Sequence, residues 1–280
     1  MGIEMVLFNP DRQKGAWDET FSLSEAQRAR SFHKGLSGYK PTPLRRLDGL
    51  AGRLGLGGLY VKDESLRFGL NAFKGLGGSY ALGRVIAERM GKKPEELGDV
   101  PAGTFTFVTA TDGNHGRGVA WAAKNLSQNA VVYMPKGSAK ERLENIRALG
   151  AQAEITELNY DDTVRFAKEQ ADENGWILVQ DTAWEGYETI PSWIMQGYMT
   201  MALEAAESLG GRVPTHIFLQ AGVGAMAGAV TGFFSSFYGA QRPKIVITEP
   251  NRAACLFKTA GAGDGALHKV EGDLDSIMAG

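Results

Sequence analysis

Short apolar runs alternate with longer amphipathic stretches through the middle of the chain. Runs rich in β-branched residues predict strands, and apolar positions at helical spacing predict helices. The predicted strands are Thr104–Thr109, Ala130–Met134, Ala151–Thr156 and Trp176–Gln180. The predicted helices between them are Gly116–Leu126, Ala139–Leu149 and Asp161–Asn174. Because strands joined by helices pair in parallel through right-handed crossovers, this block predicts a small α/β unit with a parallel sheet.

The pattern also predicts elements on both sides of that block. Before it, we expect a helix at 24–33 capped by Ser22 or Ser24, an extended proline-bearing segment at 39–44, a helix at 47–54, a strand at 59–62 and a helix from Lys74 to about Met90. After it, we expect a helix at 190–208 with Pro191 at its first position, a strand at 215–220, a helix at 229–237 and a final strand at 244–248. The chain therefore divides into a large α/β domain, residues 1–82 and 185–280, and a small inserted α/β domain, residues 83–184.

Composition and charge narrow the range of partners. The chain has 280 residues, of which 43% are hydrophobic, enough for one large α/β domain or two smaller ones. Its 30 basic and 32 acidic residues leave a net charge of −2, so we expect neither a nucleic-acid nor a membrane partner. Cys255 is the single cysteine and the CxxC and HExxH spacings are absent, so the sequence predicts neither a disulfide framework nor a metal site. The first residues lack the apolar core of a signal peptide, so a reducing cytoplasm is the expected location.

The stretch Arg67–Tyr80 places one lysine in an unusual setting. Lys74 lies between Phe73 and Gly75 at the predicted start of a helix. We expect the apolar ring of Phe73 to lower the pKa of the Lys74 amine, because burial disfavours the charged form. A neutral amine is what Schiff-base chemistry on an aldehyde requires. For an isolated lysine, the usual interpretation would be a surface side chain at a helix start.

A glycine-rich turn, Gly222–Gly228, follows one predicted strand and precedes a helix. Backbone N–H groups at such a turn converge on an anion, so phosphate is the natural ligand. The alternative is a dinucleotide site, in which Gly222 and Gly224 form the turn and Glu249, at the end of the next strand, binds a ribose. The third glycine, Gly228, lies one residue too far along for that motif. Plain packing is a third interpretation.

Two further loops carry acids and amides at the ends of predicted strands. In Thr109–Gly118, Asn114 can donate to a phenolic oxygen, and Asp112 can hold an ammonium or accept a proton. Either residue could instead cap the following helix. In Gln180–Tyr187, Asp181 lies at the carboxyl end of a strand, where open α/β sheets place ligand sites, although a cap or turn is again the alternative.

These sites together resemble those of the fold-type II pyridoxal-phosphate enzymes, and within that group they are close to those of the diaminopropionate ammonia-lyases. The runs that carry the resemblance are Lys62–Ser65, Phe73–Lys74, Thr111–Trp121, Met134–Ala139, Asn159–Val164, Gln180–Tyr187 and Gln220–Gly228. The resemblance extends from about Phe32 to Gly280. It implies a tryptophan synthase β-like fold of two open twisted α/β domains, with pyridoxal 5'-phosphate in the cleft. It also implies a homodimer that acts in amino-acid catabolism.

Residue roles follow from the resemblance position by position. Lys74 corresponds to the lysine that binds the cofactor aldehyde, with Phe73 beside it, and Asn114 to the partner of the pyridine 3-oxygen. The phosphate cup corresponds to Gly222, Val223, Gly224 and Ala225. Asp112 stands where serine and threonine dehydratases usually carry a serine, and an acid there suits a substrate with a second amine. Asp181 corresponds to the other acid of the active site.

The reaction implied by the resemblance is α,β-elimination of 2,3-diaminopropionate to pyruvate and ammonia, with Lys74 or Asp112 removing the α-proton. A serine or threonine dehydratase is the alternative lyase, and an inactive fragment that at most binds the cofactor is the third interpretation. The chains of the family continue well past the position of Gly280, and their later residues include the group that faces the pyridine nitrogen. We therefore expect this chain to retain its cofactor weakly and to have little activity.

Overall fold

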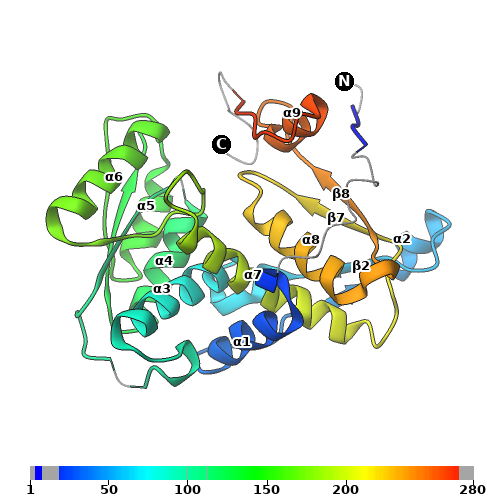
Figure 1. The fold of residues 1–280 in the computed structure, drawn as a ribbon, viewed down its shortest axis with the longest axis horizontal. Coiled ribbons are helices and arrows are strands. Elements are labelled where there is room, and N and C mark those ends of the chain that lie inside the picture. Colours follow the sequence, from blue (N-terminus) through cyan, green and yellow to red (C-terminus); the bar gives the residue numbers. More distant parts are fainter. Residues whose placement is uncertain (1–3, 8–18, 99, 112, 271–280) are drawn as a thin grey trace.

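Three helices run through the middle of the molecule and join two groups of other elements (Figure 1). The computed structural model describes residues 4–7, 19–98, 100–111 and 113–270. The three central helices are α1 (Leu23–Lys34), α3 (Lys74–Met90) and α7 (Thr189–Ser208). Helix α1 begins where its sequence predicts, because the Ser22 hydroxyl accepts the amide of Glu25 at 3.3 Å and caps the helix.

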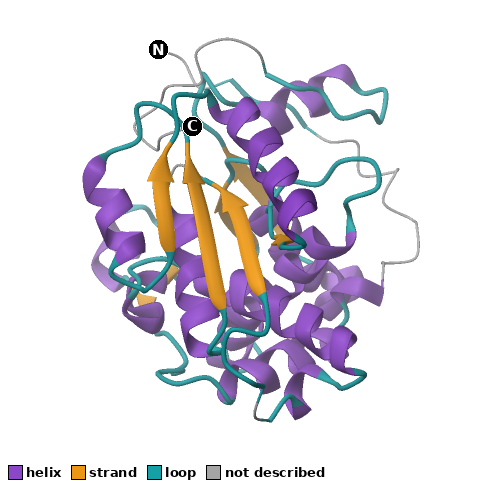
Figure 2. Ribbon diagram, turned by 90° about the vertical axis from the view of Figure 1, so that its left-hand side faces the viewer, coloured by secondary structure: helices purple, strands orange, loops and turns teal. Residues whose placement is uncertain are grey.

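A four-stranded parallel sheet forms the core of the first group. Its strands stand in the order β5-β4-β3-β6, and Figure 2 shows its longer strands side by side among the helices. The strands are β3 (Thr106–Ala110), β4 (Asn129–Met134), β5 (Gln152–Ile155) and β6 (Ile177–Leu178). The connecting helices are α4 (Asn114–Asn125), α5 (Lys140–Arg147) and α6 (Tyr160–Asn174). The predicted parallel α/β unit is confirmed.

Side chains of this sheet alternate between two buried faces. Phe107 and Val132 belong to the main core, which includes the apolar face of α4, whereas Val108 and Val131 pack on Ala167 of α6. Successive residues of a strand point to opposite faces, so a sheet covered on both sides needs a nearly continuous apolar run. The apolar sequences of β3 and β4 meet this requirement.

Helix α3 is packed closely between α4 and α7, and glycines make the approach possible. A Cβ atom on Gly118 of α4 would lie 2.8 Å from the carbonyl group of Lys74, and one on Gly197 of α7 would lie 2.5 Å from the carbonyl oxygen of Leu76. Both distances are shorter than atoms tolerate, so the backbones can meet only where no side chain intervenes. The start of α3 is thereby held against two neighbours. Because α3 crosses position 82 without a break and shares the core on both sides, the division into residues 1–82 with 185–280 and residues 83–184 stays a proposal.

The remaining strands and helices lie mainly in the second of the two groups that the central helices join. An antiparallel pair consists of β1 (Leu44–Arg46) and β2 (Tyr60–Lys62), with α2 (Asp48–Arg53) between them. A parallel pair, β7 (His216–Gln220) and β8 (Lys244–Thr248), packs with α8 (Ala225–Tyr238) and is followed by α9 (Cys255–Ala262). Short 3₁₀ turns complete the described chain: η2 (Glu19–Phe21), η3 (Glu64–Gly69), η4 (Pro94–Glu96) and η5 (Gly239–Gln241).

Three sequence predictions were wrong in detail. Helix α9 follows the last strand, where neither helix nor strand was predicted. Helix α8 begins at Ala225 because the alanines and methionine of the turn favour helix despite their glycine neighbours. Helix α7 begins at Thr189, so Pro191 occupies its third position, where its missing N–H is still harmless.

Two kinds of feature are absent from the described residues. Among them, no helix combines the length and apolar character needed to cross a bilayer. The same part of the chain contains no group of three or more His, Cys, Asp or Glu side chains arranged to hold a metal ion.

Candidate active site

Lys74 and Asp181 meet in an ion pair at the start of α3. Lys74 is the first residue of the helix, and its Nζ donates to Oδ2 of Asp181 at 2.6 Å. The Lys74 side chain is 20% exposed and that of Asp181 is 7% exposed. Asp181 follows β6, at the carboxyl edge of the parallel sheet, where such folds place their ligands. The fold thus brings together two residues that the sequence singled out independently.

The pKa values of Lys74 and Asp181 are shifted in opposite directions, that of Lys74 upward and that of Asp181 downward. Burial lowers the pKa of the Lys74 amine, but the oxygen of Tyr198 and the carboxylate of Asp181 outweigh burial and raise it above its ordinary value. Burial raises the pKa of the Asp181 carboxyl, but His115 and Lys74 outweigh burial and hold it well below its usual range. The Phe73 ring centroid lies 5.6 Å from Nζ, a position from which an aromatic ring favours a cation. The expectation that Phe73 lowers the pKa of Lys74 is therefore wrong: a carboxylate within hydrogen-bond distance dominates.

The side chains of His115 and Tyr198 lie beside this pair, and the sequence predicted a role for neither. The His115 ring is buried; its Nε2 donates to the carbonyl of Val179 at 2.9 Å, and its Nδ1 lies 3.6 Å from Oδ2 of Asp181. The ring of Tyr198, on α7, has its centroid 5.8 Å from Nζ of Lys74. Neither Nδ1 of His115 nor the hydroxyl of Tyr198 has a hydrogen-bond partner in the described part of the chain.

Such unpaired groups mark the place for a polar ligand, because buried polar atoms are normally hydrogen-bonded. His115 directly follows Asn114 in a loop that the sequence already marked as a candidate site, so its position could have identified it as a further site residue. Tyr198 lies within a long apolar helix, and its sequence context carries no such signal.

Asn114 is the first residue of α4, and its side chain is exposed. The predicted alternative, that Asn114 caps this helix, is wrong. The capping position is Gly113, and the hydroxyl of Thr111 accepts the amides of Gly113 and Gly116 at 3.0 and 3.3 Å. The side-chain amide of Asn114 is therefore not engaged in capping the helix. Asp112 lies outside the described residues, so its predicted role as an acid or a cap stays a prediction.

The turn Gly222–Ala225 joins β7 to α8 and leaves the helix start open. Gly224 caps α8 with a left-handed backbone, φ 92°, and as a glycine it has no side chain that could bond to the first amides of the helix. A Cβ atom on Gly222 would meet nothing within 4 Å, and Val223 is half exposed. The first four N–H groups of a helix lack partners within it, so this end suits an anion such as a phosphate.

Glu249 does not have the position that a ribose-binding acid needs. Its two carboxylate oxygens accept the backbone amides of Leu256 and Phe257 at 2.9 and 2.8 Å. The carboxylate therefore stabilises the start of α9, as acids at helix N-termini do. The dinucleotide alternative loses the acid on which it depended.

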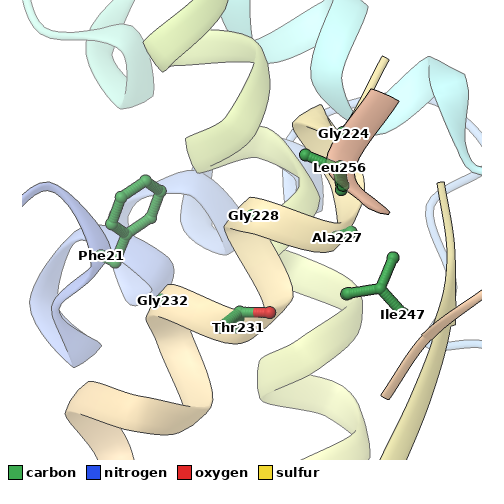
Figure 3. Close-up of a pocket in the computed structure, with 8 residues that line it drawn as sticks. All are labelled: Phe21, Gly224, Ala227, Gly228, Thr231, Gly232, Ile247 and Leu256. Carbon is green, nitrogen blue, oxygen red and sulfur yellow. The ribbon is translucent and has the colours of Figure 1, made fainter. Parts of the chain in front are cut away.

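An apolar hollow of about 410 Å³ lies beside the same turn. Figure 3 shows the residues that line it: Phe21, Gly224, Ala227, Gly228, Thr231, Gly232, Ile247 and Leu256. This lining contains no titratable group and one hydroxyl, that of Thr231, so it cannot carry acid–base chemistry. The candidate chemistry lies at Lys74 and not in this hollow.

The described residues fit pyridoxal 5'-phosphate. Lys74 offers an amine for its aldehyde, Asn114 an amide for its ring oxygen, and Gly222–Ala225 an uncapped helix start for its phosphate. The unpaired Nδ1 of His115 and the unpaired Tyr198 hydroxyl offer further polar contacts next to the amine.

Comparison with known proteins agrees with this fit. The sequence model of a family described as "Pyridoxal-phosphate dependent enzyme" matches residues 36–280. A diaminopropionate ammonia-lyase from Salmonella typhimurium is 51% identical over 288 residues, covering 98% of this chain and 71% of that protein. A biosynthetic L-threonine dehydratase from the same organism is 26% identical over 227 residues, covering 79% of this chain and 38% of that protein.

Solved structures give the same result. The diaminopropionate ammonia lyase from Escherichia coli, crystallised with an aminoacrylate-PLP azomethine reaction intermediate, superposes with a TM-score of 0.85 at 52% identity. The match covers 90% of this chain and 66% of that one, so the present chain spans about two thirds of the length of such relatives. The shared fold and the matched sequence show that the chain belongs to the pyridoxal-phosphate dependent enzymes of fold type II, and that its cofactor is pyridoxal 5'-phosphate.

Proposed function

We propose that this protein is an ammonia-lyase that converts 2,3-diaminopropionate to pyruvate and ammonia by α,β-elimination. The observation that carries the proposal is the Lys74–Asp181 pair at the start of α3, beside buried polar atoms that have no hydrogen-bond partner in the described part of the chain. The similarity to diaminopropionate ammonia-lyases over nearly the whole chain supports the same reaction.

Three parts of this chain bind different parts of the cofactor. Lys74 attaches the cofactor, Asn114 orients its ring and Gly222–Ala225 hold its phosphate. When bound, pyridoxal phosphate supplies an aldehyde that captures the α-amine of the substrate and a ring that withdraws electrons from the α-carbon. Phe73 packs against Tyr198 with ring centroids 5.2 Å apart, and this contact forms an apolar wall next to the amine. Such a wall limits the access of water to the reacting atoms.

Elimination needs one group to remove the α-proton and another to protonate the leaving β-amine. As a free amine, Lys74 would be within hydrogen-bond distance of the Asp181 carboxylate, which would favour its taking up a proton. Asp112 is the alternative base, and the face on which it lies decides which enantiomer it serves.

A second amine on the substrate explains the acids of the site. A buried carboxylate such as Asp181 stabilises a nearby ammonium more strongly than a neutral hydroxyl. A dehydratase of serine or threonine would also have to protonate its leaving hydroxyl, but its substrate carries no β-ammonium for a carboxylate to hold. The threonine dehydratase similarity is also much lower, at 26% identity.

The test is an assay of pyruvate release by the purified chain with pyridoxal phosphate. Both enantiomers of 2,3-diaminopropionate are compared with L-serine and L-threonine, and Lys74→Ala is the control for background. We expect diaminopropionate to be the preferred substrate by kcat/KM. Faster turnover of serine or threonine would replace this function with the dehydratase, and absence of turnover with retained cofactor would leave a binding protein.

Assembly and location are proposed on the resemblance alone. We propose a homodimer that acts in cytoplasmic amino-acid catabolism, without nucleic-acid or membrane partners. The near-neutral charge of −2 and the single cysteine are compatible with this setting. Light scattering on a size-exclusion column tests the dimer, and a single monomeric peak at micromolar concentration would contradict it.

A further inference from the structure

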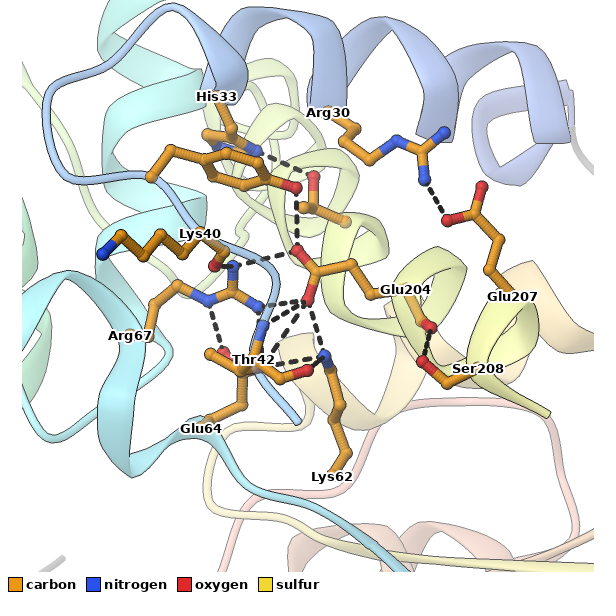
Figure 4. A network of polar contacts seen from close by, with 12 residues as sticks. Arg30, His33, Lys40, Thr42, Lys62, Glu64, Arg67, Glu204, Glu207 and Ser208 are labelled. Atoms are coloured by element: carbon orange, nitrogen blue, oxygen red, sulfur yellow. Dashed lines mark hydrogen bonds and ion pairs between the residues drawn. The ribbon is translucent and has the colours of Figure 1, made fainter. Parts of the chain in front are cut away.

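A second cluster of charged side chains lies buried next to the segment that precedes Lys74. The guanidinium of Arg67 bonds to both oxygens of Glu204 at 2.9 and 2.6 Å and to both oxygens of Glu64 at 2.8 Å each. Lys62 Nζ also donates to Glu204, at 2.6 Å. Figure 4 shows Arg67 and Lys62 converging on the carboxylate of Glu204, which projects from α7. The two cations and two carboxylates cancel in charge, so the cluster is electrically balanced.

The backbone that follows Arg67 is in a conformation that it would not adopt alone. Phe68 has φ 53°, Gly69 has φ 69° and Asn71 has φ 55°. Left-handed backbone is disfavoured for residues with a Cβ atom, and it persists only where the surroundings hold it in place. Two such residues within four positions lie directly before the start of α3.

Contacts with α4 hold the far end of this segment. The ring of Phe68 stacks on Trp121 with centroids 4.0 Å apart, and the carbonyl of Leu70 accepts a bond from Arg117 at 2.9 Å. A Cβ atom on Gly75 would lie 2.9 Å from Leu70 and 3.0 Å from Phe68. The segment therefore rests directly on the first turn of the helix that carries Lys74. Its near end is held through Arg67, whose side chain is fully buried in the charged cluster, and through the ring of Phe68, which also lies beside the rings of His33 and Tyr39.

We propose that Glu204 is a positioning residue, which holds Arg67 and thereby keeps segment 67–71 in the conformation that directs Lys74 toward Asp181. The inference rests on the proposed function of Lys74. A buried ion pair gives little net stability compared with apolar side chains of the same size, so a gain in stability alone does not explain why Arg67 and Glu204 are buried here beside two partly buried charges. A fixed conformation before the reacting lysine does explain it, because small misplacements of a reacting group are costly.

The first test measures how fast Lys74 reacts. The full chain is incubated with pyridoxal phosphate, reduced with borohydride at timed intervals and mapped for labelled lysines. We expect Glu204→Gln to slow labelling of Lys74 by roughly 10- to 100-fold, with exposed lysines such as Lys136 labelled as before. Glu204→Asp keeps the charge and should recover part of the rate. The control is Glu207→Gln on the same helix, which removes an exposed ion pair with Arg30 and should leave Lys74 labelling unchanged.

Labelling of Lys74 at the original rate in a Glu204→Gln protein that still unfolds cooperatively would overturn the proposal. If Glu204→Gln does not fold, Tyr39→Phe takes its place, because it removes only the 2.8 Å bond from the Tyr39 hydroxyl to Glu204. This milder variant should slow labelling about two- to threefold, the effect of a partial loss of positioning. An unchanged rate would then overturn the proposal.

Hydrogen exchange provides a second readout that does not depend on the cofactor. In Glu204→Gln or Tyr39→Phe, amides of residues 68–76 should exchange faster than in the original protein, while those of β4 keep their rates. Uniform acceleration over the whole chain would indicate a merely structural role and overturn the proposal. If the unaltered protein fails to label at Lys74, the proposed function is wrong, and exchange alone decides whether Glu204 positions the segment.

Discussion

The two buried charge clusters of this molecule differ in how completely their polar atoms are paired. In the cluster of Arg67 and Glu204, each guanidinium nitrogen and each carboxylate oxygen has a partner. At Lys74, the amine donates one short bond to Asp181, and Nδ1 of His115 and the hydroxyl of Tyr198 have no hydrogen-bond partner within the described chain. Both clusters are buried against α7, so burial alone does not distinguish them.

The difference indicates what each cluster does. A fully paired network holds its members in one arrangement, because any other arrangement leaves a buried charge exposed to apolar surroundings. A cluster with unpaired atoms and shifted pKa values is typical of a site that a ligand completes. The following variants should separate these roles, in order of decreasing effect.

Removing the Lys74 amine should have the largest effect on turnover. Lys74→Ala should lower pyruvate release by at least about 10³-fold, because both covalent attachment and one proton-transfer group are lost. The absorbance of bound cofactor should also change. Lys136→Ala, in an exposed pair with Glu157, is the matched control and should leave both unchanged. Substantial turnover by Lys74→Ala would mean that another lysine carries the cofactor.

Asp112→Asn should separate catalysis from capping. Asparagine caps a helix about as well as aspartate, so stability should stay within about 1 kcal/mol of the original. If Asp112 transfers a proton, turnover of at least one diaminopropionate enantiomer should fall by roughly 10²–10⁴-fold. The measurement is kcat for both enantiomers beside the exposed-acid control Asp161→Asn. Near-normal rates on both enantiomers would return Asp112 to a structural role.

Asp181→Asn should destabilise the protein by about 3 kcal/mol at neutral pH, since it leaves a buried ammonium without its carboxylate. The folded-state pKa of Asp181 is depressed, so its contribution is present above the unfolded pKa and is lost as pH falls through the folded value. The pKa of Lys74 is raised, so its contribution is present below its unfolded pKa and is lost as pH rises through the folded value. The deficit should therefore be nearly constant from about pH 5 to pH 9.

Urea unfolding at several pH values measures this deficit. The control is Asp172→Asn, which removes an exposed pair with Lys168 and should cost no more than about 0.5 kcal/mol. If the two variants lost equal amounts of unfolding free energy, the Lys74–Asp181 pair would behave as a surface ion pair.

His33, beside the paired cluster, should give a smaller and pH-dependent effect. Its Nε2 donates to the carbonyl of Leu76 at 2.9 Å, so Nδ1 accepts the hydroxyl of Thr200 at 2.7 Å. Burial lowers the pKa of His33 to about 3. Between that value and the unfolded pKa of about 6.5, the unfolded chain binds one more proton, so stability falls as pH decreases.

Because of His33 alone, the free energy of unfolding should change by about 1.4 kcal/mol per pH unit near pH 5. His33→Asn should flatten the stability profile there, although it lowers stability at pH 7. Denaturation midpoints at pH 4.5, 5.5 and 7 measure the slope, where these pH values are chosen to fall roughly within and above the window. An unchanged slope would mean that His33 titrates normally in the folded protein.

Local sequence was enough to predict the parallel α/β block and most element positions. Strand β8 coincides with its predicted range, and β3 and β4 lie within two residues of theirs, because apolar alternation and short connections are local properties. Local context also singled out Lys74, Asp181 and the turn Gly222–Gly228 as candidates, since helix starts and strand ends carry recognisable residues. The resemblance then supplied their roles as proposals.

The tertiary structure decided which of these groups touch and in what state. Lys74 and Asp181 are 107 positions apart, and their contact depends on how closely α3, α4 and α7 approach at Gly118 and Gly197. That contact reversed the expected direction of the Lys74 pKa shift. His115, Tyr198 and the Arg67–Glu204 cluster likewise gain their importance from burial and pairing, which no local pattern encodes. Sequence alone determined the elements and the candidate chemistry, whereas the packing of three helices determined the electrostatics, because charge interactions depend on distance and exposure and not on order along the chain.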